Sequence, residues 1–101
     1  MVDVSVKAPT LRQATAGAHI RMKRETAALI AAGGLPKGDV FQVARIAGVM
    51  AAKRTGDLIP LCHPLELTNV DLSFAVDAGE GTVSVEATVK TIGRTGVEME
   101  A

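Results

Sequence analysis

Residues 70–89 (VDLSFAVDAGEGTVSVEATV) decide the fold of this chain. Apolar and polar residues alternate on both sides of residues 77–81, which are rich in glycine and acidic side chains. Alternation with a period of two is typical of a half-buried strand, and a glycine-rich break favours a tight turn between two such strands. The stretch therefore predicts an antiparallel β-hairpin with one buried face.

Upstream of this hairpin the pattern changes. Leu65 and Leu67 have the opposite parity from the apolar residues of the first strand, which predicts a bulge or a bend near residues 68–69. Alternating valines predict another short strand over residues 2–6. Residues 9–18 show no clear period, which leaves them without a predicted element.

Two helices are predicted between these strands. The first covers residues 21–32 and is ended by Gly33, Gly34 and Pro36. The second follows Asp39, whose carboxylate can accept hydrogen bonds from the free N–H groups of a helix start.

The second helix is expected to end at Lys53 and Arg54, where cations suit the carbonyl end, with Gly56 closing it. Its spacing predicts one apolar face, which consists of Val40, Val43, Ala44, Ala47, Met50 and Ala51.

Composition limits the class of protein. The chain has 101 residues, 48% of them hydrophobic and 22% charged, with a net charge of zero, so we expect a single globular domain over residues 1–101. The neutral total gives no support for nonspecific nucleic-acid or membrane binding. With two Phe and no Trp or Tyr, the chain also lacks the aromatic platform of a sheet that stacks RNA bases.

The expected compartment is the cytoplasm. The single cysteine, Cys62, cannot form a disulfide within the chain, which fits a reducing compartment. No apolar run reaches the roughly 18 residues of a membrane span, and the first residues do not resemble a signal peptide.

The tripeptide Leu61–His63 stands between Pro60 and Pro64. Prolines on both sides predict an extended segment outside any central strand ladder, and they would hold His63 at a fixed angle. An imidazole held in this way suits hydrogen bonding to a ligand or proton transfer near neutral pH. The alternative is a buried thiol beside an ordinary surface histidine. One Cys and two His are too few for a zinc site, and we expect no metal.

Several cations could converge on an anion. Gly38 and Asp39 lead into a helix start, where free amides bind phosphate, although the carboxylate of Asp39 would compete with it. The alternative is that these cations are solvated surface charges. The candidates are Lys37, Arg45, Lys53, Arg54 and Arg94.

The last residues predict the start of another helix. Thr95 and Glu98 have the spacing of a capping box, and the chain stops at Ala101 within the second turn. Because isolated turns are unstable, we expect this chain to be part of a longer protein. In such a helix Glu98 and Glu100 would face different sides, so they are not expected to form an acid–base pair.

Six segments occur together in one known family. They are residues 1–5 (MVDVS), 37–40 (KGDV), 44–48 (ARIAG), 51–55 (AAKRT), 57–64 (DLIPLCHP) and 95–101 (TGVEMEA). In this order they resemble molybdenum cofactor biosynthesis protein C, the family of cyclic pyranopterin monophosphate synthases.

The resemblance implies a ferredoxin-like α+β subunit, an antiparallel sheet with helices packed on one face. It also implies dimers with active sites at the subunit interfaces and a hexamer built from three dimers. The implied activity is that of a lyase without a redox cofactor. It converts 3′,8-cyclo-7,8-dihydroguanosine triphosphate into cyclic pyranopterin monophosphate and pyrophosphate. The alternative is a noncatalytic nucleotide- or pterin-binding module.

Site residues follow from the matching motifs. The resemblance implies catalytic roles for Lys37 and His63. It implies that substrate contacts, in addition to His63, are made by Leu61, Cys62, Met99, Glu100, Lys53 and Arg12. The family's last helix carries a further catalytic aspartate and lysine that have no counterpart among these residues, so the chain alone is expected to be poorly folded and inactive.

Overall fold

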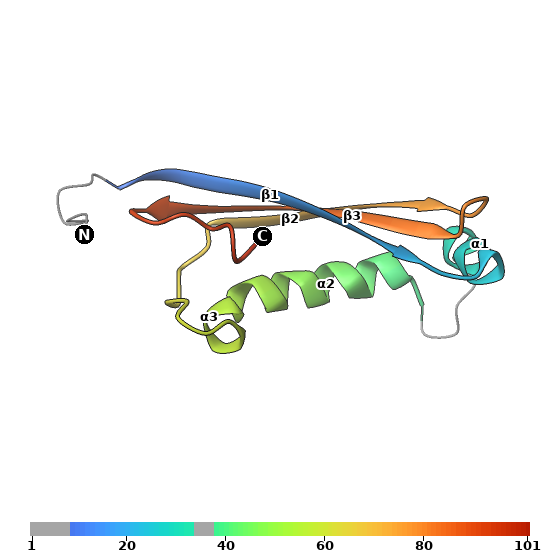
Figure 1. The fold of residues 1–101 in the computed structure, drawn as a ribbon, viewed down its shortest axis with the longest axis horizontal. Coiled ribbons are helices and arrows are strands. Elements are labelled where there is room, and N and C mark those ends of the chain that lie inside the picture. Colours follow the sequence, from blue (N-terminus) through green and yellow to red (C-terminus); the bar gives the residue numbers. More distant parts are fainter. Residues whose placement is uncertain (1–8, 34–37) are drawn as a thin grey trace.

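A computed structural model describes residues 9–33 and 38–101. The protein is α+β, a three-stranded antiparallel sheet with helices packed against it (Figure 1). In chain order the elements are β1 (Thr10–Arg21), α1 (Arg24–Ala32), α2 (Val40–Lys53), α3 (Thr55–Leu58), β2 (Asn69–Asp77) and β3 (Thr82–Gly93).

The predicted hairpin is confirmed. β2 and β3 pair antiparallel, and residues such as Leu72 and Phe74 lie opposite apolar partners on β3. The turn between the strands is closed by Asp77, whose carboxylate accepts a hydrogen bond from the backbone N–H of Glu80 at 3.1 Å. Gly81 has a φ of +68°, a conformation that glycine adopts readily. The bend near residue 68 is also confirmed, because the chain turns there into β2.

The strand β1 has no counterpart among the predicted elements. It pairs with β3 along its whole length, and the strand order is β1-β3-β2 (Figure 1). Its inward positions at 14, 16 and 18 are alanines, which differ too little from their neighbours in hydrophobicity to produce a clear period. Arg21 belongs to this strand, so the helix predicted from residue 21 begins three residues later, at Arg24.

Both predicted helices form. Asp39 caps α2 as expected: its Oδ1 accepts hydrogen bonds from the backbone N–H groups of Phe41 at 2.9 Å and Gln42 at 3.4 Å. Gly33 ends α1 with a φ of +72°. The predicted end of α2 at Lys53 and Arg54 is confirmed, with Arg54 as the C-cap, whereas Gly56 does not close the helix because it lies inside α3.

The buried face of α2 differs from the predicted one. The Phe41 ring stacks on Phe74 of β2, with ring centroids 5.1 Å apart, and Gly48 lies so close to Leu72 that a side chain would clash. This close approach sets the rotation of the helix. Val43 and Met50, which belong to the predicted apolar face, are therefore 58% and 50% exposed.

The core lies between α2, the sheet and the residues after β3. Its buried members are Ala52, Val89 and Val97, with Ala14, Leu65, Leu67, Val70 and Ala101 packed around them. Val97 brings the last residues back across the helix-bearing face of the sheet. The helix predicted from Thr95 is not formed in the structure. The segment makes a single turn, closed by a hydrogen bond from the N–H of Ala101 to the carbonyl of Val97 at 3.0 Å.

Three predictions lie outside the described residues: the strand over residues 2–6, the helix stop at Gly34 and Pro36, and the position of Lys37. None of the helices in the described ranges has the length and apolar character needed to cross a membrane.

Candidate functional site

The segment Ile59–Cys62 forms a tight turn rather than the predicted extended chain. Pro60 occupies its second position, and the backbone N–H of Cys62 donates to the carbonyl of Ile59 at 3.3 Å. Leu61, at the third position, has a φ of +67°. This is the pattern of a type II turn. As expected, the segment belongs to no strand ladder.

Two contacts fix the chain just after His63. Gly56 of α3 lies so close to Pro64 that a Cβ would stand 3.1 Å from the proline nitrogen. Two residues further on, the buried hydroxyl of Thr91 donates to the carbonyl of Glu66 at 2.5 Å. The segment is thus held between α3 and the central strand.

The thiol of Cys62 and the imidazole of His63 lie in different environments. Cys62 is a free, half-buried thiol, and His63 is exposed. Within the described part of the chain, the imidazole of His63 makes no hydrogen bond and no ion pair. Its nitrogens are therefore available to a ligand.

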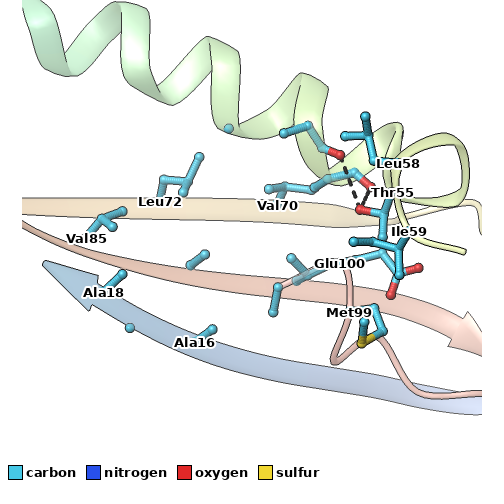
Figure 2. A pocket seen from close by; sticks show the side chains of 17 residues that line it. Ala16, Ala18, Thr55, Leu58, Ile59, Val70, Leu72, Val85, Met99 and Glu100 are labelled. Carbon is cyan, nitrogen blue, oxygen red and sulfur yellow. Dashed lines mark hydrogen bonds between the residues drawn. The ribbon is translucent and has the colours of Figure 1, made fainter. Parts of the chain in front are cut away.

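An apolar groove of about 370 Å³ runs along the helix-bearing face of the sheet, between β1 and α2 (Figure 2). We call it the α2–sheet groove. At one end, Met99 and Glu100 lie near Leu58 and Ile59, the residues that lead into the turn. Its remaining lining residues are Ala16, Gly17, Ala18, Gly48, Ala51, Ala52, Thr55, Val70, Leu72, Val85, Ala87, Val89 and Ala101.

Thr55 joins α2 to α3 beside this groove. It is 6% exposed, and its Oγ1 lies 2.9 Å from the carbonyl of Ala52 and 3.2 Å from that of Ala51 (Figure 2). Like Thr91, it fixes the backbone around the candidate site, and sequence reasoning missed both. A buried threonine that bonds a backbone carbonyl leaves no pattern in a single sequence.

The two predicted substrate-binding cations, Arg12 and Lys53, lie in different parts of the structure. Arg12 is half-buried, and its Nε donates to the carbonyl of Gly93 at 3.3 Å, which holds it at the end of the sheet where β3 finishes. Lys53 lines a different cleft, of about 260 Å³, beside Leu67 and Asn69. The structure therefore does not bring Lys53 into the groove that holds Met99 and Glu100.

Arg45 is not directed at an anion. Its Nε and Nη2 donate to the carbonyl of Leu72 at 3.3 and 3.2 Å, and its guanidinium lies 5.5 Å from the centre of the Phe74 ring. It binds α2 to the edge strand β2. No group of three or more His, Cys, Asp and Glu side chains among the described residues has metal-binding geometry.

The two ends of α2 carry different parts of the predicted site. Gly38 lies just before its N-terminus and follows Lys37 in sequence, whereas α3 and the His63 segment lie at its other end (Figure 1). The helix has 14 residues, so about 21 Å separates the two ends.

Comparison with known proteins agrees with this arrangement of motifs. The model of the MoaC family matches residues 1–101. Proteins named cyclic pyranopterin monophosphate synthase are 59% identical in Roseiflexus sp. (strain RS-1), 58% in Heliobacterium modesticaldum and 59% in Parvibaculum lavamentivorans. Each match covers all of this chain.

The relatives are longer than this chain. It spans 64% of the length of the Roseiflexus and Heliobacterium proteins and 63% of the Parvibaculum protein. The family match extends over every segment that carries a candidate site residue, including the turn at Leu61 and the residues that return to the groove. The chain belongs to the MoaC family.

Proposed function

We propose that this protein works as a cyclic pyranopterin monophosphate synthase in molybdenum cofactor biosynthesis. One observation carries the proposal beyond family membership. The residues after β3 fold back so that Met99 and Glu100 line the same groove as Leu58 and Ile59, where the turn before His63 begins. Segments far apart in sequence thus supply the candidate ligands at one end of the molecule.

The proposed substrate is 3′,8-cyclo-7,8-dihydroguanosine triphosphate, which is converted into the cyclic monophosphate with release of pyrophosphate. Opening and reclosing its purine-derived ring needs proton transfers, and the exposed imidazole of His63 suits them. The polyphosphate carries several negative charges, which Arg12 and Lys37 would stabilise by charge-assisted hydrogen bonds. Lys53 lines a different cleft from the one beside Met99 and Glu100, so it would not contact the substrate from within that groove.

We also propose that the observed three-stranded sheet and its helices are part of a ferredoxin-like fold. Such a fold has two helices on one face and four strands, and β1, α2, β2 and β3 supply one long helix and three strands. The α2–sheet groove offers an apolar surface for a second long helix. Among the described residues no strand pairs with the outer edge of β1, where a fourth strand could be added. The relatives are longer by over a third of their length, which is enough for both elements.

The separation along α2 supports a site made from two copies of the chain. Within one chain, the N-terminal end of α2 lies about 21 Å from the end that carries α3 and the His63 segment. We propose that a site using His63 together with Lys37, which lies outside the described residues, draws the two from different protomers. This agrees with the dimer, and with the hexamer of three dimers, that we propose as the working assembly in the cytoplasm.

The test is pyrophosphate release from the cyclic triphosphate, with the Roseiflexus relative as positive control. His63→Gln and Lys37→Ala should each reduce kcat at least about a hundredfold, because each removes a group that takes part in the chemistry. The assay is run on the protein at the full length of its relatives, with the 101-residue chain as a control that should be inactive. If the full-length protein binds the substrate without turnover while the relative turns over, the noncatalytic binding module is the correct function.

Mixing the two variants tests the shared site. Random pairing of Lys37→Ala with His63→Gln chains creates mixed dimers in which one of the two sites has both groups. Activity should recover to about a quarter of the unsubstituted level. No recovery, with exchange of chains verified by mass spectrometry, would place both groups in one protomer.

A further inference from the structure

The hydroxyl of Thr55 is buried where α2 passes into α3. Thr55 is the first residue of α3 and directly follows Arg54, the C-cap of α2. Its Oγ1 lies within hydrogen-bond distance of two carbonyls in the last turn of α2, those of Ala52 at 2.9 Å and Ala51 at 3.2 Å (Figure 2). The last carbonyls of a helix lack N–H partners within the helix, so the hydroxyl supplies a donor there.

Three consecutive hydrogen bonds connect this hydroxyl to the segment that carries His63. The first joins the Thr55 side chain to the carbonyl of Ala52. In the second, the carbonyl of Thr55 accepts from the backbone N–H of Ile59 at 2.9 Å. In the third, the carbonyl of Ile59 accepts from the backbone N–H of Cys62 at 3.3 Å. The end of α2 is therefore linked to the residue before His63 by a continuous chain of hydrogen bonds.

The same threonine lines the α2–sheet groove. Thr55 and Ile59 share this lining with Met99 and Glu100, which reach the groove from the segment after β3 (Figure 2). The direction in which α3 leaves α2 therefore sets how the turn before His63 stands relative to those two residues. A threonine hydroxyl that bonds the carbonyl four residues earlier bends a helix, so Thr55 has the chemistry to set this direction.

We propose that Thr55 is a positioning residue for the reaction: its hydroxyl fixes the angle between α2 and α3 and so places the imidazole of His63 for proton transfer. The proposal rests on the function proposed above and deepens it. Because Thr55 is 6% exposed and its hydroxyl bonds α2, it acts through the backbone that leads to His63. A misplacement of about 1 Å costs up to about a hundredfold in rate, so the effect is measurable in kcat.

Substitutions at position 55 separate the hydroxyl from the shape of the side chain. Valine keeps the shape and removes the hydrogen bonds, whereas serine keeps the hydroxyl and loses one methyl group. In the protein at the full length of its relatives, Thr55→Val should reduce kcat for pyrophosphate release about tenfold, with KM within about twofold. Thr55→Ser should retain kcat within about twofold. Thr55→Cys, whose thiol donates only weakly, should fall between them and replaces valine if that variant does not fold.

A matched control separates placement from stability. Ala27 is fully buried in α1, at the opposite end of the sheet from α3 (Figure 1). Ala27→Gly loses helix propensity and Thr55→Val loses a buried hydrogen bond, so each should lower Tm by about 3 °C. With both proteins assayed well below their transitions, Ala27→Gly should have the kcat of the unsubstituted protein.

The imidazole signals in an NMR spectrum test the placement without substrate. The Cε1–H signal of His63, identified by its loss in His63→Gln, should shift or broaden in Thr55→Val and keep its position in Thr55→Ser. His19 lies on β1, near the end of the sheet that carries α1, and serves as the internal reference. Its signal should be the same in all three proteins.

Each other outcome overturns a defined part. Equal losses of kcat in Thr55→Val and Ala27→Gly would leave Thr55 a structural role only. A loss in Thr55→Ser as large as that in Thr55→Val would show that the hydroxyl is not the group responsible, and an unchanged His63 signal in Thr55→Val would show that the imidazole is not displaced. If the unsubstituted protein releases no pyrophosphate, the proposed function fails, whereas the NMR comparison still decides whether Thr55 positions His63.

Discussion

At the scale of single residues, hydroxyl groups fix the backbone near the candidate site. Thr91 is 3% exposed in the central strand and bonds the carbonyl of Glu66, two residues after Pro64. Thr88, three residues earlier on the same strand, shares a hydrogen bond of 2.9 Å with Thr15 in an exposed position. The same residue type thus has a structural role at one position and a solvated one at the other.

We expect Thr91→Val to destabilise the protein by about 1 kcal/mol, because the carbonyl of Glu66 loses its buried donor. Urea denaturation measures the change. Thr88→Val is the matched control and should change the free energy of unfolding by less than about 0.5 kcal/mol, since water can replace its lost partner. Equal effects of the two substitutions would contradict an anchoring role for Thr91.

At the scale of elements, the capping residue of α2 determines where the helix begins, and its packing contacts determine which side faces the sheet. Asp39 supplies the cap that the sequence pattern predicts, and its carboxylate bonds the N–H groups of the first turn. The rotation of the helix about its axis depends on Gly48, where close approach to Leu72 decides which residues face the sheet. Sequence spacing predicts that a helix has an apolar face but leaves open which apolar residues form it.

Asp39→Ala should lower the free energy of unfolding by about 1 kcal/mol, because two backbone N–H groups at the helix start lose their acceptor. Asp39→Asn keeps a capping oxygen and should retain most of that stability. Thermal unfolding followed by circular dichroism distinguishes the two variants. The cap assignment fails if both substitutions have the same effect.

At the scale of the whole molecule, apolar surface remains uncovered. The described part of the chain buries few large side chains, and its radius of gyration is 16.7 Å, against about 13 Å for a compact domain of this length. The α2–sheet groove is an apolar concavity of about 370 Å³ beside the site. Its lining of alanine and glycine would let another backbone approach closely.

We expect this chain to bind the dye ANS in the α2–sheet groove, because exposed apolar concavities take up such probes. Ala51→Lys places a charge in the groove wall and should reduce the fluorescence by more than about half. Ala47→Lys lies on the same helix outside the groove lining and is the control, with fluorescence close to that of the unsubstituted chain. Similar losses for both variants would show that the dye binds elsewhere.

The sequence by itself determined the β2–β3 hairpin, the cap at Asp39 and the family. Hairpins and caps depend on residues close together in the chain, and the family motifs are local strings such as residues 57–64. Only the tertiary structure decided that residues 10–21 form a strand, because their pairing with β3 comes from backbone groups far away in sequence. The same holds for the left-handed Leu61 and for the meeting of Glu100 with α3, which depend on how distant segments pack and close a turn.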